Sequence, residues 1–256
     1  MRLETQELIV RRAGQDILDR ASLCAESGEM IGVIGANGAG KSTLLSVLAG
    51  LLKPDTGMVR LDGRSLAEIR GRDLARVRAY LPQNPRCEWP ISVERLVALG
   101  LTPSLPAIGR MPSAYQTQIA ATLADCDLTD RRDQAATTLS GGELARAMLA
   151  RALVGNPKIL IADEPITGLD PRHALDTMRR LRTLAENGTL VIAALHDLTL
   201  AARYATRIVA LHRGQVAADG ATASTLNPAL LREIFDVEGC VHGSGDRAFV
   251  DFMAPP

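Results

Sequence analysis

No uncharged apolar run in this sequence approaches the roughly 18 residues that a membrane helix needs, and the first residues contain no apolar signal core. The sequence also lacks an excess of charge, because 29 lysines and arginines are matched by 29 aspartates and glutamates. These absences predict a chain that does not itself span a membrane and whose main partner is not nucleic acid. A small nucleotide, recognised by its phosphates, remains a possible binding partner of such a chain.

Cysteine is scarce, since only four are present, and no pair has Cys-x-x-Cys spacing. The simplest interpretation is reduced, structural thiols in a cytoplasmic protein. Hydrophobic residues make up 46% of the 256 positions. A chain of this length and composition can bury a full core, and we expect one compact unit with a subdomain.

The stretch Gly35–Thr43 matches the G-x-x-x-x-G-K-[ST] phosphate loop at every fixed position. Met30–Ile34 before it has strand length, and a helix after it is predicted by apolar residues at helical spacing. Those residues are Leu44, Leu45, Val47, Leu48, Leu51 and Leu52. We expect Lys41 to reach the β- and γ-phosphates and Ser42 to ligate Mg²⁺. The predicted nucleotide-binding residues of the loop are Gly35, Asn37, Gly38, Gly40, Lys41, Ser42 and Thr43.

Two adjacent carboxylates end the buried-type strand predicted at Ile159–Glu164. Neighbouring side chains of a strand point in different directions, so the two acids suggest two roles. Asp163 would hold Mg²⁺ and Glu164 would polarise the attacking water, as hydrolysis of a γ-phosphate requires. An Asp-Glu pair that caps a helix is the alternative.

Two further features have a structural and a functional interpretation. Ser140, Gly141 and Gly142 open a predicted helix, where they either cap its start or form a second anion site at its positive end. His196 follows a predicted strand at Leu190–Leu195, and a lone histidine there is usually a surface or capping residue. The residues alone leave both alternatives open.

The order of the predicted elements indicates an α/β fold. Apolar stretches at Leu8–Val10 and Ile17–Leu23 predict an antiparallel hairpin, the middle third carries helical spacing, and later strands and helices alternate. Such alternation around a phosphate loop predicts a mostly parallel, helix-covered sheet with the nucleotide at the C-terminal ends of its strands. Five arginines predict a solvated face, namely Arg64, Arg70, Arg72, Arg76 and Arg78.

Several motifs occur in an order that is typical of one family. They are the phosphate loop, Gln83, Leu139–Glu143, Asp163-Glu164, Gly168–Asp170 and His196. With them the chain resembles, over nearly its full length, the ATP-binding subunit of an ABC transporter. The resemblance implies ATP and Mg²⁺ as cofactors and Leu139–Glu143 as the family signature. It further implies that Gln83 contacts Mg²⁺ or water and couples to the membrane partner, and that His196 senses the γ-phosphate. The catalytic residues would then be Lys41, Gln83, Glu164 and His196, and the metal ligands Ser42, Gln83 and Asp163.

The resemblance also implies an architecture and partners. A P-loop NTPase (RecA-like) core at 1–84 and 158–222, with an N-terminal antiparallel β portion, would carry an inserted α-helical signature subdomain at 85–157 and a C-terminal helix and tail at 223–256. Two copies would form a head-to-tail dimer, in which each ATP lies between one phosphate loop and the other copy's signature helix. The other partners implied are integral membrane permease subunits and, indirectly, an extracytoplasmic substrate-binding protein. The chain would lie peripherally on the cytoplasmic face of the bacterial inner membrane.

Two positions depart from the family pattern. Arg12 stands where members commonly place an aromatic ring for adenine stacking, so a guanidinium would stack on the base or the stacking would come from elsewhere. The signature ends in Glu143, where glutamine is commoner. The first departure concerns affinity for adenine and leaves phosphate binding untouched.

A subgroup of importers is similar in several further segments, so the predicted function is an ATP-hydrolysing subunit that powers uptake of a metal chelate. That subgroup serves ferric siderophores, haem and cobalamin. The segments are Ser92–Gly100, His196–Tyr204, Gln215–Gly220 and Asn227–Phe235. Leu101 and Ser104, however, replace an arginine and a histidine that such proteins often carry. The alternatives are a soluble ABC ATPase in assembly or repair, an ABC ATPase for another cargo, and a P-loop kinase.

Overall fold

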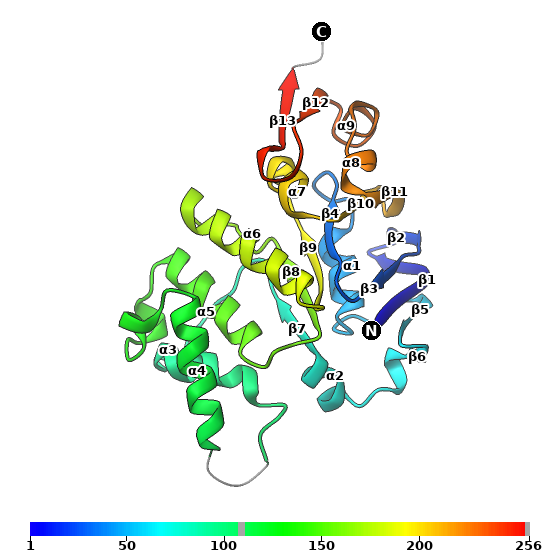
Figure 1. Cartoon of the computed structure of the whole chain (residues 1–256). Coiled ribbons are helices and arrows are strands. Elements are labelled where there is room, and N and C mark those ends of the chain that lie inside the picture. Colours follow the sequence, from blue (N-terminus) through cyan, green and yellow to red (C-terminus); the bar gives the residue numbers. More distant parts are fainter. Residues whose placement is uncertain (107–110, 254–256) are drawn as a thin grey trace.

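The computed structural model describes residues 1–106 and 111–253. A six-stranded sheet lies at its centre in the order β11-β10-β4-β9-β8-β7 (Figure 1). Neighbouring strands are parallel except β10 and β11 at one edge. The strands are β4 (Met30–Ile34), β7 (Arg78–Leu81), β8 (Ile159–Asp163), β9 (Leu190–Ala194), β10 (Arg207–His212) and β11 (Gln215–Ala221). The predicted mostly parallel sheet is confirmed.

Helices cover both faces of this sheet, which explains the apolar composition of its central strands. β4, β8 and β9 are buried at every position, since a parallel strand between two layers has no solvent face. Along β8, Leu160 and Ala162 join one hydrophobic cluster and Ile159 and Ile161 join the other. The helices are α1 (Lys41–Leu48), α2 (Gly71–Val77), α3 (Val93–Ala98), α4 (Ser113–Asp125), α5 (Gly141–Leu153), α6 (Pro171–Glu186), α7 (Leu198–Tyr204), α8 (Thr222–Thr225) and α9 (Pro228–Phe235).

A second, antiparallel sheet covers the phosphate-loop helix α1. Its strands are β1 (Arg2–Arg12), β2 (Gln15–Ala21), β3 (Cys24–Glu26), β5 (Thr56–Leu61) and β6 (Arg64–Ser65). The predicted hairpin is present as β1 and β2, and Leu8 and Leu18 bury against Leu44 and Leu45 of α1 in one cluster. The helix therefore lies between two sheets, which fixes its position.

Helices α3, α4 and α5 form a group at one side of the central sheet (Figure 1). Val93 and Leu96 of α3, Ile119 of α4 and Ala147 of α5 belong to the same buried cluster. This is the inserted helical region that the sequence predicts between β7 and β8. The described ranges contain no helix that is both long enough and apolar enough to cross a membrane.

The prediction of a helix that continues to Leu52 was wrong. α1 ends at Leu48, and Gly50 follows with a φ of 64°. The N–H groups of Leu51 and Leu52 both return to the carbonyl oxygen of Ser46, which is how a glycine beyond the last turn closes a helix. Leu51 is consequently 58% exposed.

Two other expectations need correction. Arg78 does not belong to a solvated face, because its Nε and Nη1 are buried where it begins β7. The predicted C-terminal helix is present as α9, but part of the predicted tail forms a hairpin of β12 (Glu238–His242) and β13 (Phe249–Met253). Residues 254–256 of that tail lie outside the described residues.

The contrast between Leu48 and Leu51 gives a stability test. Leu48→Ala removes a side chain that is 1% exposed, so we expect it to lower the free energy of unfolding by about 2–5 kcal/mol. Leu51→Ala, three residues on, should change it by less than about 0.5 kcal/mol. Urea denaturation of both variants and the parent protein measures the difference. Equal losses in the two variants would contradict the observed end of α1.

Candidate functional site

The phosphate loop joins β4 to α1 and is shaped by glycines with positive φ. Gly35 (φ 152°) and Gly40 (φ 101°) have no room for a side chain, because a Cβ would lie 2.4 Å from the Leu211 carbonyl oxygen and 2.7 Å from that of Ile17. Gly38 (φ 79°) has open space, so its backbone conformation alone favours glycine. α1 begins without a side-chain cap. Its first N–H groups are therefore available to an anion.

Lys41, the first residue of α1, is only 6% exposed. Its Nζ donates to the carbonyl oxygens of Gly35 at 2.8 Å and Ala36 at 3.1 Å. Burial lowers the pKa of Lys41, while the negative charges of Glu164 and Asp163 act in the opposite direction. The loop thus holds a desolvated ammonium group beside the start of the helix, an arrangement that suits phosphate oxygens.

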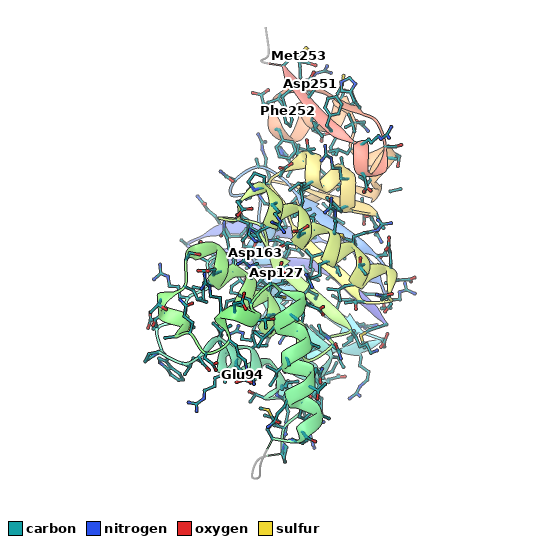
Figure 2. All side chains as sticks on the ribbon, turned by 60° about the vertical axis from the view of Figure 1, so that its left-hand side comes forward. Glu94, Asp127, Asp163, Asp251, Phe252 and Met253 are labelled. Atoms are coloured by element: carbon teal, nitrogen blue, oxygen red, sulfur yellow. The ribbon has the colours of Figure 1, made fainter. Side chains whose placement is uncertain are left out.

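Asp163 ends β8 and is 3% exposed, in the middle of the molecule (Figure 2). The Ser42 side chain lies close enough to favour the charged form of Asp163, yet Asp163 Oδ1 has no hydrogen-bond partner among the described residues. Burial raises the pKa of Asp163, because desolvation disfavours the charged form. A carboxylate oxygen without a partner, beside a hydroxyl, is the type of donor set that a hard divalent cation takes.

Glu164 follows with a φ of 53°, a left-handed conformation that few non-glycine residues adopt. Thr167 Oγ1 donates to Glu164 Oε2 at 2.9 Å and His196 Nε2 contacts Oε1. The Gln83 side chain lines the same cavity, close enough to favour the charged form of this carboxylate. Although burial opposes ionisation, the polar groups of Gln83, Thr167 and His196 together lower the pKa of Glu164. The carboxylate is therefore charged at neutral pH.

A cavity of about 310 Å³ brings most of the predicted site residues together. It is lined by Ile17, Asn37, Gly38, Ala39, Gly40, Lys41, Ser42, Thr43, Gln83, Glu164 and His196. Asp163 lies next to it through its contact with Ser42. Ser140, Gly141 and Gly142 are not among the lining residues, so within one chain the predicted signature is separate from the phosphate loop.

Ser140 caps α5, as the structural interpretation of the serine-glycine turn expects. Its Oγ accepts from the Glu143 N–H at 3.3 Å, and Glu143 Oε2 accepts from the Ser140 N–H at 2.9 Å, which together form a capping box. Arg131 Nε donates to Glu143 Oε1 at 2.9 Å. Hydrogen bonds from the Ser140 backbone, its hydroxyl and Arg131 lower the pKa of Glu143 to about 2. Glu143 therefore has a definite structural role at the start of this helix.

Residues 18–167 match the family model described as "ABC transporter". The match covers more than half of the chain and includes the phosphate loop, Gln83, Ser140 and Glu164. The chain belongs to the ABC transporter family. It is an ABC ATPase subunit with an ATP-binding cassette, and the predicted P-loop NTPase fold is confirmed.

Curated relatives of this ABC ATPase match almost from end to end. The hemin import ATP-binding protein HmuV of Rhodopseudomonas palustris (strain BisA53) is 42% identical, over 96% of this chain and 92% of its own length. HmuV of Bordetella avium (strain 197N) is 39% identical over 94% of each protein. The alignments therefore span nearly the whole of this chain and of both relatives.

Solved structures agree with the family assignment. A dimeric ATP-binding cassette in a post-hydrolysis state, bound to ADP and Pi, has a TM-score of 0.78 and 25% identity, over 86% of this chain and 98% of that chain. A metal-chelate type ABC transporter in an inward-facing conformation has a TM-score of 0.82 over 99% of this chain and 97% of that chain. At 21% identity, the second likeness supports the fold alone.

Two residues of this ABC ATPase site that lie outside the phosphate loop were not identified by the sequence analysis. Thr167 stands three residues after Glu164 in a turn, where its N–H also bonds to the Glu164 carbonyl oxygen at 3.2 Å, and a hydroxyl at such an offset is a usual turn signal. Ile17 lines the cavity from β2, and no local pattern points to it. Arg12 is not among the lining residues, and its stacking on adenine stays a prediction.

The low pKa of Glu143 predicts a pH dependence of stability. Its folded-state pKa of about 2 lies below the ordinary value of 4.5, so its stabilising contribution is present above pH 4.5 and is lost as the pH falls toward 2. We expect Glu143→Gln to make the free energy of unfolding fall less steeply with acid than in the parent protein. Urea denaturation at several pH values below 5 measures the slopes.

Glu233→Gln, which replaces an exposed carboxylate on α9, is the matched control and should keep the parental slope. Identical slopes in the parent protein and Glu143→Gln would contradict the role of the capping box.

Proposed function

We propose that this protein is the ATP-hydrolysing subunit of an importer that moves haem, or a closely related metal chelate, through a membrane permease. The observation that carries the proposal is the near full-length similarity to hemin import ATP-binding proteins from two genera, at 39–44% identity. The subunit would lie on the cytoplasmic face of the bacterial inner membrane. The permease and an extracytoplasmic binding protein would select the cargo, while this chain supplies the energy.

The phosphate loop is our candidate for binding the ATP phosphates. Lys41 is desolvated, and its hydrogen bonds go to neutral carbonyl oxygens. Ammonium bonds to anionic oxygens are about twice as strong as bonds between neutral groups, so Lys41 would exchange these carbonyls for the β- and γ-phosphates. The N–H groups at the start of α1 would hold the same phosphates.

The residues around Asp163 fit Mg²⁺. Asp163 Oδ1 is buried without a partner among the described residues, and the hydroxyl of Ser42 is beside it. Both are hard oxygen donors, and Gln83 supplies an amide on the same cavity. The described ranges contain no group of three or more His, Cys, Asp and Glu side chains that is arranged to hold a metal ion, so the remaining ligands would be phosphate oxygens and water. When bound, Mg²⁺ would neutralise charge on the β- and γ-phosphates.

Glu164 is the residue that we assign to the attacking water. Its carboxylate is charged, lines the cavity and is fixed by Thr167 on one oxygen and His196 on the other. A general base must be ionised and aimed at the proton that it removes. His196 would sense the γ-phosphate through this contact. Gln83 lines the same cavity beside this carboxylate and would connect it to the permease side.

A second copy of the chain would complete the site. Ser140, Gly141 and Gly142 lie outside the phosphate-loop cavity, at the start of α5, whose positive end suits a γ-phosphate. In a head-to-tail dimer these residues of one copy would face the loop of the other, giving two equal sites. The core at 1–84 and 158–222 and the signature subdomain at 85–157 would then be the two parts that move against each other.

Transport of haem tests the proposed function. Proteoliposomes that hold this subunit with its co-purified permease, ATP inside and the loaded binding protein outside, should take up haem in an ATP-dependent manner. Lys41→Ala should abolish both uptake and ATPase activity, because it removes the positive charge that would face the phosphates at the start of α1. Circular dichroism checks that the variant is folded. Uptake of cobalamin or a ferric siderophore, without uptake of haem, would contradict haem as the cargo. ATPase activity at the parental level in Lys41→Ala would contradict the role assigned to Lys41.

Substitution of the two acids separates their roles. Glu164→Gln keeps size but removes the charge that activates water, so we expect turnover to fall by about 10²-fold or more while ATP binding persists. The variant should accumulate as an ATP-bound dimer. Asp163→Asn should instead lose productive Mg²⁺-ATP binding first. Size-exclusion chromatography with and without Mg²⁺-ATP, beside a turnover assay, distinguishes the two, and hydrolysis by Glu164→Gln at the parental rate would remove Glu164 from the chemistry.

A further inference from the structure

A second cavity, which we call the C-terminal cavity, lies beside the hairpin of β12 and β13. Its volume is about 710 Å³, against about 310 Å³ for the phosphate-loop cavity. Residues of α6, α7, α8 and β12 line it, together with the loop that joins β12 to β13. Figure 1 shows α7, α8 and the hairpin together, away from helices α3, α4 and α5. Cavities of about 300–1,000 Å³ are of the size that small-molecule ligands and cofactors occupy.

Much of the wall of the C-terminal cavity is apolar and formed by small side chains. Its apolar lining residues include Ala202, Ala205, Ala223, Leu226 and Val241. Alanine side chains leave a smooth surface, which suits a flat ligand better than a branched one. None of the residues assigned to ATP or Mg²⁺ lines this cavity.

The charged lining residues leave one guanidinium available. Arg182 is paired with Glu186, whose Oε1 lies 2.8 Å from its Nε. Arg203 Nε donates to the Ala248 carbonyl oxygen at 2.6 Å, and Arg203 forms no ion pair with a described residue. The other acid of the lining, Asp246, is exposed, so water screens its charge. Arg203 therefore still has N–H groups for an anionic ligand.

Cys240 of β12 adds a thiol to the lining. It is free and exposed. Cys126 differs, because it is buried and its burial raises the pKa of the thiol to about 11. The thiolate is the form of cysteine that binds metals, and an apolar environment opposes it. Exposure thus leaves Cys240 able to bind a metal.

A thiol, a guanidinium and a smooth apolar wall together suit an iron porphyrin. A bare metal ion would lack ligands, because the described ranges contain no group of three or more His, Cys, Asp and Glu side chains arranged to hold one. Haem iron brings four porphyrin nitrogens and takes only axial ligands from a protein. We propose that the C-terminal cavity binds ferric haem after import, with Cys240 as axial ligand, and that bound haem slows ATP hydrolysis. The inference rests on the proposed function, which supplies haem in the cytoplasm.

Binding of haem in this way changes no oxidation state. The Cys240 thiol would release its proton to solvent, its sulfur would form the bond to ferric iron, and the water on that side of the iron would leave. One propionate would pair with Arg203, and the other would stay in water at the exposed rim. The ring would cover the alanines of the wall, and removal of this apolar surface from water favours binding.

The hairpin is attached to the helix that follows His196, which connects the C-terminal cavity to the hydrolysis site. The Val250 N–H donates to Thr199 Oγ1 at 3.1 Å near the start of α7, and Arg203 near its end bonds to the loop before β13. α7 begins two residues after His196, which contacts Glu164. A ligand that moves the hairpin or Arg203 would therefore move α7, and with it the contact that fixes Glu164.

Titration of the purified subunit with ferric haem, followed by absorbance, tests the site. We expect Cys240→Ser to lower the affinity by at least about tenfold and to remove the thiolate signature from the electron paramagnetic resonance spectrum. His242→Ala is the matched control, because His242 is an exposed potential iron ligand of the same strand but does not line the cavity. This control should bind haem with the parental affinity and spectrum.

A second substitution tests the guanidinium. Arg203→Gln keeps a donor for the Ala248 carbonyl oxygen but removes the charge, so we expect the affinity for haem to fall by about tenfold with the thiolate signature retained. Arg60→Gln, at an exposed arginine of β5, is its control and should bind like the parent protein. Thermal midpoints near the parental value in the four variants show that lost affinity is not misfolding.

ATP hydrolysis tests the regulatory part of the proposal. Ferric haem should slow hydrolysis by the parent subunit but not by Cys240→Ser, and the two proteins should be equally active without haem. Parental affinity in Cys240→Ser, or lost affinity in His242→Ala, would overturn the site. Unchanged hydrolysis by the haem-bound parent would overturn the inhibition. Uptake of another chelate in place of haem by the complete transporter would contradict the proposed cargo, whereas the titrations would still decide the site.

Discussion

The site depends on two buried charges that lie near each other without pairing. Among the buried polar residues described, only Lys41 and Asp163 are ionisable, and no ion pair joins them. Desolvation shifts the pKa of each toward its neutral form. The hydrophobic core has to offset this cost, since a buried charge without a full set of partners is destabilising. A ligand that brings an anion to Lys41 and a cation to Asp163 would offset the desolvation of each charge. A metal-bound nucleoside triphosphate carries such an anion and such a cation.

The rest of the fold keeps these two charges in place. Asp163 is at the C-terminal end of β8, Lys41 follows the C-terminal end of β4, and β9 hydrogen-bonds to both strands. α1 is held between the central sheet and the N-terminal sheet, so Lys41 cannot move away with its helix. The phosphate loop, which joins β4 to α1, runs so close to the carbonyl oxygens of Leu211 and Ile17 that only glycine fits at Gly35 and Gly40. The positions of Lys41 and Asp163 are thus fixed by the packing of the elements around them.

The sequence predicts those parts that depend on local pattern. The phosphate loop, the buried runs of β4 and β8, and the start of α9 each have a signal within ten residues. Where distant contacts decide, the sequence misleads. Leu51 has helical spacing, but Gly50 turns the chain first. Arg78 looks like its charged neighbours, but its Nε and Nη1 are buried at the start of β7, a strand that contacts α5. Ile17 reaches the site only because β2 packs on the loop, and β12 and β13 lack a regular alternation of apolar and polar residues.

Glu143 shows how one departure from a family pattern changes the physics at the start of α5. The single proton of the Ser140 hydroxyl is donated to Glu143 Oε2 at 2.9 Å. If Ser140 is to bind a γ-phosphate of a second copy, that proton has to leave the carboxylate, and two anions then face each other at the helix start. Glutamine would cap the helix without this repulsion. Here Arg131, at 2.9 Å from Glu143, supplies a compensating positive charge. Ser140, Glu143 and Arg131 therefore act as one unit, and a change in any of them alters what the positive end of α5 offers to phosphate.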